Sequence, residues 1–225
     1  MLQGKRLALF DMDGVLYNSM PYHAIAWKKS MEAYGIDMTE QEAYMYEGMR
    51  GVETIKIVAG RQWKRDIPDE EAQQMYRKKS EEYAKFPTAS LIEGVKEFQQ
   101  FLVEMGLKVG IVTGSGQMSL INRILHDFEG LVSPDIIVTA NDVSHGKPLP
   151  DPYIKGMEKG GFSPEETIVI ENAPLGVQAG KAAGCFVIAV NTGPLSDEIL
   201  KDSGADIVCS DMTQARNALL SQHNY

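Results

Sequence analysis

The sequence predicts an α/β fold in which a parallel sheet carries helices on both faces and a helical segment is inserted after the first strand. Two features of its 225 residues lead to this prediction. From residue 91 onward, short continuous apolar runs alternate with segments of helical pattern, as in sheets whose strands are buried on both faces. Before that, more than 90 residues separate the first apolar run from the second, which exceeds what one crossover helix requires.

About six strands are expected. The first, RLALFD, occupies residues 6–11 and ends on an acid. The others are expected at 107–112, 135–140, 166–170, 185–191 and 205–210. Because each is short and mostly apolar and helical segments lie between them, the strands are expected to run parallel.

The segments between these strands have helical patterns. One helix is expected over QMSLINRILHDF (117–128) and one over 151–161, where Gly160 and Gly161 end it. Another begins at Pro174, a residue suited to the first helical turn. A short helix before the last strand and a final helix after it complete the chain.

Residues 18–88 contain helical patterns and no convincing strand. One helix is expected over 20–35, with a proline in its first turn and Gly35 at its end, and another over 69–86, stopped by Pro87. We therefore expect a helical cap over 18–88 that lies above the sheet as a lid. The catalytic core is expected to comprise residues 1–17 and 89–225.

Composition limits the classes of function. The net charge is −9, from 22 basic and 31 acidic residues, and an acidic chain lacks the basic face that nucleic-acid binding needs. A small phosphorylated substrate requires only a locally positive pocket. Cys185 and Cys209 lack the spacing of a redox or zinc motif, and no run has membrane-spanning length. The N-terminal apolar stretch is too short for a secretory signal. These features predict a cytoplasmic protein without membrane partners, and a lid that opens and closes favours a monomer.

Asp11 and Asp13 follow the first strand with one methionine between them. In an extended segment, residues i and i+2 point to the same side, so these two carboxylates repel each other unless a cation, a shared proton or a donor intervenes. A calcium loop does not explain them, because glycine arrives too early and Tyr22 stands where that loop requires glutamate.

Polar residues also follow three other expected strands. Thr113 and Gly114 follow the second strand, Lys147 follows the third after a short loop, and Glu171 and Asn172 follow the fourth. Each alone has a plain explanation, such as a helix cap or an exposed loop cation. Together they converge, because the carboxyl ends of parallel strands share one edge of the sheet and ligands bind there.

This set of residues suits phosphoryl transfer. Asp11 can act as the nucleophile and form an aspartyl phosphate, while Asp13 protonates the leaving oxygen and later accepts the proton of the attacking hydroxyl. Mg²⁺ would allow the acids to coexist, with ligands from Asp11, the Asp13 carbonyl and Asn172. Glu171 is expected at the same metal site, either as a ligand or orienting a metal-bound water or Lys147. Thr113, the Gly114 N–H and Lys147 can bind phosphoryl oxygens.

Four motifs, DMDGVLYNS, VTGSG, GKPLPDP and VIENAPLGVQAG, resemble in this order the motifs of the haloacid dehalogenase superfamily. Within it, the chain resembles the β-phosphoglucomutase-like group of phosphatases and mutases, which carry a small helical cap after the first motif. The resemblance implies a Rossmann-like core, Mg²⁺, and the nucleophile and acid–base roles of Asp11 and Asp13. The second motif-one aspartate favours phosphate chemistry over dehalogenation.

The chain departs from this pattern in two places. The fourth motif carries Glu171-Asn172 where the mutases usually have Glu-Asp. The stretch GMRG (48–51) stands where β-phosphoglucomutase has Gly-Val-Ser-Arg, so that Arg50 comes one residue before the place of the phosphate-binding arginine. The amide of Asn172 can still ligate Mg²⁺ but brings no charge, so weaker metal binding is expected in the free enzyme. The missing arginine counts against a mutase.

Four cap residues are candidates for recognition of the leaving group, His23, Trp27, Glu47 and Lys79. Each also has a plain explanation as a solvated or packing residue. If Glu47 faces the site, it could cap a hydroxylated leaving group, receive Mg²⁺ brought by a compact substrate such as pyrophosphate, or exclude sugar bisphosphates.

The sequence thus predicts a Mg²⁺-dependent phosphohydrolase acting on a sugar phosphate or pyrophosphate through an aspartyl phosphate. The alternative is a β-phosphoglucomutase that uses the same phosphoenzyme. A signalling receiver module is disfavoured by the insertion and by the place of Asp11 on the first strand. A catalytically inactive metabolite binder is disfavoured because Asp11, Asp13, Thr113 and Lys147 are all present.

Overall fold

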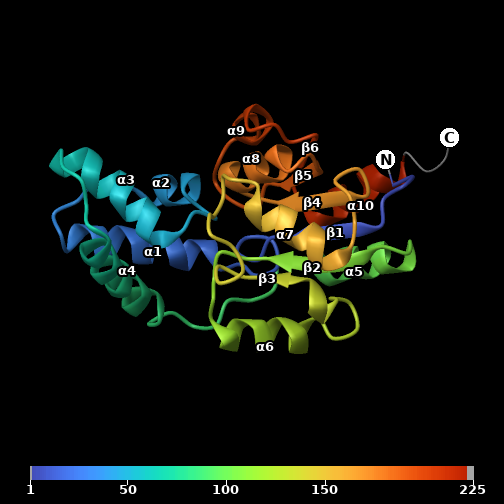
Figure 1. The fold of residues 1–225 in the computed structure, drawn as a ribbon, viewed down its shortest axis with the longest axis horizontal. Helices are drawn as coiled ribbons and strands as arrows, with labels where there is room; N and C mark the ends of the chain where they lie inside the picture. The colour runs from blue at the N-terminus through green and yellow to red at the C-terminus, as the bar shows by residue number, and fades with distance from the viewer. Residues whose placement is uncertain (1, 222–225) are drawn as a thin grey trace.

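The computed structural model describes residues 2–221 and contains one parallel sheet of six strands in the order β3-β2-β1-β4-β5-β6 (Figure 1). The strands are β1 Leu7–Phe10, β2 Lys108–Val112, β3 Ile137–Val138, β4 Thr167–Glu171, β5 Phe186–Val190 and β6 Ile207–Cys209. Every neighbouring pair is parallel. The predicted α/β fold with a Rossmann-like core is confirmed.

The chain builds this sheet in two directions from its centre. It passes from β1 to β2 and β3 on one side, then returns to β4, which pairs with β1 on the other side. The strand order reverses between β1 and β4, and at such a switch point loops diverge and leave room for a ligand. The segments that follow these two strands carry the acidic motifs DMDG and ENAP.

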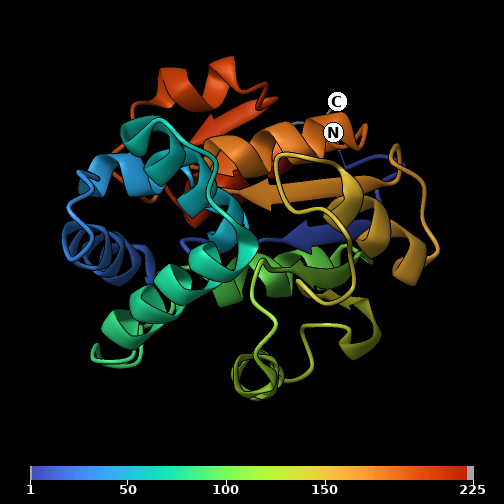
Figure 2. The same cartoon turned by 60° about the vertical axis from the view of Figure 1, so that its left-hand side comes forward.

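Helices cover both faces of the sheet (Figure 2). In the core they are α5 Val95–Glu104, α6 Met118–Asp127, α7 Asp151–Gly160, α8 Pro174–Ala182, α9 Asp197–Asp202 and α10 Met212–Leu220, with a short 3₁₀ helix, η1 Pro134–Ile136. Side chains of β1 alternate between the two faces. Ala8 and Phe10 belong to one buried apolar cluster, and Leu7 and Leu9 belong to another. This alternation explains why the strands are apolar throughout.

The regular elements of residues 18–88 are four helices, α1 Met20–Glu32, α2 Glu40–Met45, α3 Gly51–Trp63 and α4 Asp69–Tyr83. They lie beyond the carboxyl ends of the strands (Figure 1). A third apolar cluster fills their interior and includes Trp27, Met31, Ile55 and Met75. We refer to 18–88 as the cap, although its limits remain a prediction.

The two connections between cap and core run side by side. The Asn18 N–H donates to the Ser90 carbonyl at 2.8 Å, and the Ile92 N–H donates to the Leu16 carbonyl at 2.9 Å. Within residues 2–221, no helix has both the length and the apolar character needed to cross a membrane.

Candidate active site

The loop after β1 places Asp11 and Asp13 at the switch point. The Asp11 N–H continues the sheet by donating to the Ile170 carbonyl at 3.0 Å, and the Asp11 side chain is buried. Gly14 then turns with φ +76°, and a Cβ there would lie 2.0 Å from Asn172 Nδ2. Glycine therefore permits both the left-handed turn and the close approach of the first and fourth motifs.

Lys147 joins three of the motifs. Its Nζ donates to Asp11 Oδ1 and, at 2.6 Å, to Glu171 Oε1, and its side chain is 2% exposed. Burial alone would lower the pKa of Lys147, but Asp11 and Glu171 together raise it, so this lysine stays charged. Burial and the Glu171 carboxylate raise the pKa of Asp11 in spite of Lys147. The positive charge of Lys147 alone does not balance the two buried carboxyl groups of Asp11 and Glu171.

Both carboxylate oxygens of Glu171 accept hydrogen bonds. Its Oε1 also accepts from the Tyr153 hydroxyl at 2.7 Å, and its Oε2 accepts from the backbone N–H groups of Asn172 and Ala173 at 3.0 and 3.3 Å. Of the roles expected for Glu171, these contacts favour orientation of Lys147 over direct metal binding.

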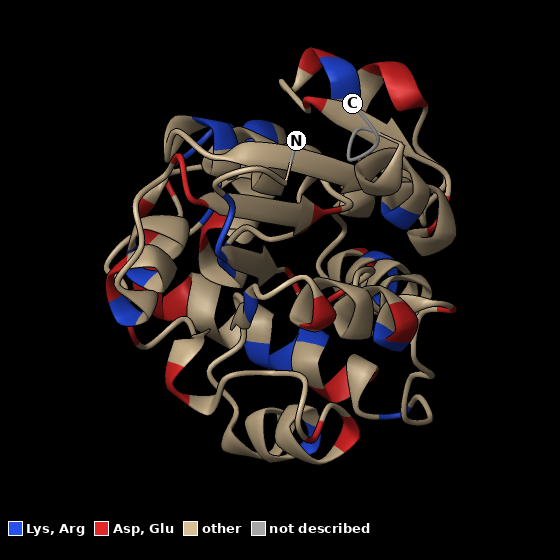
Figure 3. Ribbon diagram, turned by 90° about the vertical axis from the view of Figure 1, so that its right-hand side faces the viewer, with Lys and Arg blue, Asp and Glu red and all other residues tan. Residues whose placement is uncertain are grey.

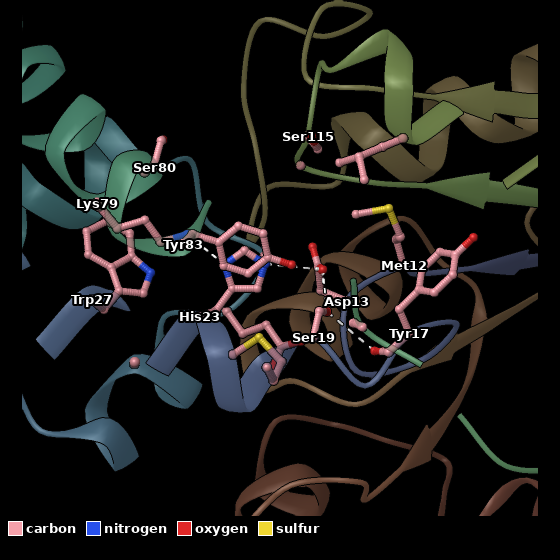
Figure 4. A pocket seen from close by; sticks show the side chains of 18 of the residues that line it. Met12, Asp13, Tyr17, Ser19, His23, Trp27, Lys79, Ser80, Tyr83 and Ser115 are labelled. Carbon is pink, nitrogen blue, oxygen red and sulfur yellow. Dashed lines mark hydrogen bonds and ion pairs between the residues drawn. The ribbon is translucent and has the colours of Figure 1, made fainter. Parts of the chain in front are cut away.

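Asp13 belongs to a separate chain of contacts that reaches into the cap (Figure 4). Ser19 Oγ donates to Asp13 Oδ1 at 2.5 Å, and His23 Nε2 lies 3.3 Å from the same oxygen. Lys79 Nζ lies 2.6 Å from His23 Nδ1. Burial and Lys79 lower the pKa of His23, so a neutral imidazole accepts from Lys79 and donates to Asp13.

These contacts determine the protonation of Asp13 and Lys79, the two residues at the ends of the series. Burial would raise the pKa of Asp13, but His23 and Ser19 lower it to about 2. Burial lowers the pKa of Lys79 to about 8, against the attraction of Asp13. Asp13 is therefore a carboxylate at neutral pH in this arrangement.

Aromatic rings of the cap surround Lys79. Lys79 Nζ lies 5.2 Å from the ring centre of Trp27, 5.8 Å from that of Tyr76 and 5.3 Å from that of Tyr83. His23 stacks on Tyr83 at 4.0 Å between ring centres. Trp27 thus reaches the site by holding Lys79, and such cation–π contacts help a buried lysine to remain charged.

Glu47 faces the site from the cap. It is 6% exposed, and its two carboxylate oxygens accept from Asn172 Nδ2 at 3.0 and 3.2 Å. Burial and the nearby Asp11 raise the pKa of Glu47 well above its usual range, while the Asn172 amide opposes them. The cap therefore adds another acid to a site that already holds several.

A cavity of about 310 Å³ connects most of the predicted residues. Its lining includes Asp11, Asp13, His23, Trp27, Glu47, Lys79 and Gly114. Thr113 and Lys147 line a smaller cavity beside it, and Gly114 borders both. Thr113 is buried, and its Oγ1 accepts from the Ser115 N–H at 3.1 Å.

The donor atoms fit a hard cation such as Mg²⁺. Asn172 Oδ1 is buried and has no hydrogen-bond partner among the described residues, and it lies beside the surplus of buried carboxylates. Over residues 2–221 the side chains do not form a cluster of three or more His, Cys, Asp or Glu that could hold a metal ion. Ligands would therefore include an amide or backbone oxygen, which Mg²⁺ accepts.

Sequence reasoning missed several residues of the site. Ser19 closes the first motif and Tyr153 directly follows GKPLPDP, so their positions within motifs were available signals. Tyr83 gave no such signal, because its role depends on the packing of α4 against α1. The guanidinium of Arg50 does not line the large cavity but contacts backbone carbonyls of a core loop.

Comparisons with known proteins show the family to which the chain belongs. Residues 8–190 match the model of a family described as haloacid dehalogenase-like hydrolase. Hexitol phosphatase A of Escherichia coli is 34% identical over 183 residues, which cover 81% of this chain and 82% of that protein. The β-phosphoglucomutase of Bacillus subtilis is 28% identical, with 84% of each chain covered.

A solved structure from Bacteroides vulgatus, provisionally assigned as a β-phosphoglucomutase, superposes on this chain with a TM-score of 0.91. It is 45% identical, and the match covers 97% of this chain and 89% of that one. The fold is thus shared with a protein that carries this provisional assignment.

Proposed function

The chain belongs to the haloacid dehalogenase-like hydrolase family, and from this premise we propose that it is a Mg²⁺-dependent phosphohydrolase of a small phosphorylated metabolite, a sugar phosphate or pyrophosphate. The observation that carries the proposal is the separation of two carboxylates into different networks. Asp11 pairs with Lys147, whereas Asp13 contacts Ser19 and His23, and both face one cavity.

In the first step, an Asp11 oxygen attacks phosphorus and the bond to the leaving oxygen breaks, giving an aspartyl phosphate. Lys147, Thr113 and the Gly114 N–H would bind the phosphoryl oxygens. The side chains of Asp11 and Asn172 and the Asp13 carbonyl would hold Mg²⁺, whose charge offsets that of the phosphoryl group.

In the second step, Asp13 accepts a proton from water, the hydroxide attacks phosphorus, and the bond to Asp11 breaks to release phosphate. The low pKa of Asp13 keeps it ionised, which leaves it able to accept a proton, although a carboxylate of low pKa is a weak base. An ionised Asp13 is a poor acid for the first step. A leaving group that departs readily as an anion, such as phosphate, therefore suits this site better than a sugar alkoxide.

Two further observations favour pyrophosphate over a sugar bisphosphate. Glu47 brings a buried acid to the cap side of the site, and when ionised it repels a second phosphate unless a cation lies between them, which Mg²⁺ carried by a compact substrate such as pyrophosphate would supply. Arg50, the nearby cap cation, is already bonded to core carbonyls. The cavity volume of about 310 Å³ would still admit a sugar phosphate, which keeps that substrate class and a mutase in the test.

The test is a phosphate-release screen over pyrophosphate, sugar phosphates and nucleotides, with and without Mg²⁺. We expect Mg²⁺-dependent release, greatest with pyrophosphate. Asp11→Asn should lose turnover by about 10³-fold or more, because an amide cannot form the acyl phosphate. Exposed Asp66 gives a matched control, since Asp66→Asn should keep full activity. Activity of Asp11→Asn like that of the control would contradict the nucleophile.

Glu47 can be tested in the same screen. Glu47→Ala should lower turnover of pyrophosphate, because a carboxylate that would receive the Mg²⁺ carried by pyrophosphate is lost. It should raise the relative turnover of sugar bisphosphates, because the carboxylate that repels their second phosphate is gone. A substrate profile equal to that of the wild type would remove Glu47 from substrate selection. Conversion of β-glucose 1-phosphate to glucose 6-phosphate, without release of phosphate, would establish the mutase instead.

A further inference from the structure

We propose that Arg50 is a positioning residue that fastens the cap to the core loop carrying Lys147 and thereby holds Glu47 in the site. This inference deepens the proposed function and rests on it. Arg50 precedes helix α3 in the cap, and its side chain crosses to the core.

The guanidinium of Arg50 makes three hydrogen bonds to one core loop. Nη1 donates to the Ser144 carbonyl at 2.7 Å, and Nη2 donates to the carbonyls of Val143 and Ala140 at 3.0 and 3.1 Å. This loop connects β3 with Lys147. Three contacts from one cap side chain to the core therefore converge on the segment that positions the site's central cation.

Among the described residues, these three carbonyls accept no other hydrogen bond. The planar guanidinium satisfies them together, because its donors are spread over a rigid fork. When the cap moves away, water must replace Arg50 at each carbonyl. The three contacts thus exist only in the arrangement that the structure shows, with the cap seated on the core.

The backbone around Arg50 packs closely against the same loop. A Cβ on Gly48 would lie 2.8 Å from Lys147 Cδ, and a Cβ on Gly146 would lie 3.0 Å from Arg50 Cγ. The cap segment therefore rests directly on the aliphatic part of Lys147, and a side chain at Gly48 or Gly146 would press on Lys147 or Arg50.

Arg50 and Glu47 are three residues apart, so the fastening of one limits where the other can lie. Glu47 meets Asn172 at 3.0 Å on one side of this short segment, and Arg50 meets the loop on the other. Release of Arg50 should thus loosen two parts of the site together, the Glu47 carboxylate and the Lys147 loop.

The test compares Arg50→Ala and Arg50→Lys with Arg61→Ala. Arg61 is a matched control, because it lies on the same helix α3 and its guanidinium contacts Glu42 within the cap at 2.6 Å. Hydrogen exchange of the free protein is followed over residues 140–147 and 47–50, and amides of β1 and β4 report whether the variant is folded. Steady-state phosphate release gives kcat and KM.

We expect exchange over 140–147 to become about tenfold faster in Arg50→Ala, and kcat/KM to fall by about tenfold or more. Arg50→Lys should fall between this variant and the wild type, since an ammonium cannot reach all three carbonyls. Arg61→Ala should match the wild type in both measurements.

Exchange in Arg50→Ala that equals that of Arg61→Ala would overturn the fastening, and faster exchange with unchanged kcat/KM would overturn the positioning role. If the wild-type protein releases no phosphate from any substrate, the proposed function fails. Hydrogen exchange needs no substrate and then still decides whether Arg50 fastens the cap.

Discussion

The two ends of the Asn172 side-chain amide differ in their surroundings. Nδ2 donates to both oxygens of Glu47, whereas Oδ1 is buried and has no hydrogen-bond partner within residues 2–221. Asn172→Asp would place a second carboxylate against Glu47. In the presence of a chelator, we expect this substitution to lower the free energy of unfolding by about 2 kcal/mol, because a buried hydrogen-bond donor is lost and two carboxyl groups are brought into contact. Added Mg²⁺ should restore this loss and raise the melting temperature more than in the wild type.

Melting temperatures in chelator and in Mg²⁺ measure this difference, with Asn141→Asp as a control. Asn141 is exposed and its Nδ2 lies 3.4 Å from the Gly116 carbonyl, so a charge there meets no buried acid. Equal Mg²⁺ shifts in Asn172→Asp and in the control would show that residue 172 is no ligand.

Asp142 should make stability depend on acid. Burial would raise the pKa of this carboxyl, but Lys159 Nζ at 2.7 Å and the N–H and hydroxyl of Thr139 at 2.8 and 2.7 Å lower it to about 2. The ordinary pKa of an aspartate side chain is 3.8, so the ionised form stabilises the folded state above about pH 4. This contribution is lost as the pH falls toward 2.

Asp142→Asn should cost about 1 kcal/mol at pH 7, after allowance for partial exposure to solvent. The difference from the wild type should shrink between pH 4 and pH 2, as measured by urea unfolding. Asp135→Asn, at an exposed position, should change stability by less than about 0.5 kcal/mol. A constant cost for Asp142→Asn down to pH 2 would contradict the assignment.

The grouping of the acids could be predicted from the sequence, because parallel strands bring the residues at their carboxyl ends to one edge of the sheet. That reasoning reached Asp11, Asp13, Thr113, Lys147 and Asn172, although their roles stay predictions. It could not decide whether Glu47 enters the site, since this depends on how the cap sits. It also left open whether Glu171 binds metal, because Tyr153 and two backbone N–H groups become visible as its partners only in three dimensions.

At the scale of elements, Gly110 in β2 shows how a helix and a strand constrain each other. A Cβ on Gly110 would lie 2.4 Å from Ile136 Cγ2 and 2.7 Å from the Ile136 carbonyl oxygen, which belongs to η1. A backbone atom cannot swing aside as the end of a side chain can. Glycine in the middle of this strand is therefore explained by the close approach of η1.

We expect Gly110→Ala to destabilise the protein by about 3 kcal/mol through overpacking between β2 and η1. Urea unfolding measures this, with Lys108→Ala as the control, because Lys108 is exposed on the same strand. That control should change stability by less than about 0.5 kcal/mol. A loss of stability in Gly110→Ala no greater than that of the control would mean that η1 can move away from β2 without destabilising the protein.

Strand and helix types followed from the sequence more readily than their limits. The strand expected at 135–140 comprises only Ile137–Val138, because residues 134–136 form η1 and the chain turns after β3. The cap helices at 20–35 and 69–86 were predicted and are present, slightly shorter. Helices α2, α3 and α5 were not predicted individually, and α2 has only six residues.

At the scale of the whole molecule, the charge is spread rather than gathered. Figure 3 shows basic residues scattered among acidic ones over the elements in view. The net charge of the chain is −9, and the absence of a nucleic-acid partner stays a prediction. The concentration of charge occurs instead inside the site, where cap and core meet.

The connection of cap to core depends on helix α6, which holds both linkers at once. Arg123 Nη2 donates to the Ala89 carbonyl at 2.5 Å on one linker. On the other, the Tyr17 hydroxyl donates to Asp127 Oδ2 at 3.0 Å, and Arg123 Nε donates to that same oxygen at 3.1 Å. The guanidinium also lies 4.0 Å from the Tyr17 ring centre. Arg123 thus contacts both linkers, about which the cap would turn.

Arg123→Ala should loosen this hinge without unfolding the core. We expect the Asn18 and Ile92 amides, which bond across the linkers, to exchange about tenfold faster, while amides of β1 and β4 keep their rates. Arg216→Ala is the matched control, because Arg216 lies over the Phe101 ring at 5.4 Å, away from both linkers. Linker exchange in Arg123→Ala no faster than in this control would show that the backbone pairing of the linkers holds the hinge alone. Faster exchange throughout the sheet would instead assign Arg123 to the stability of the core.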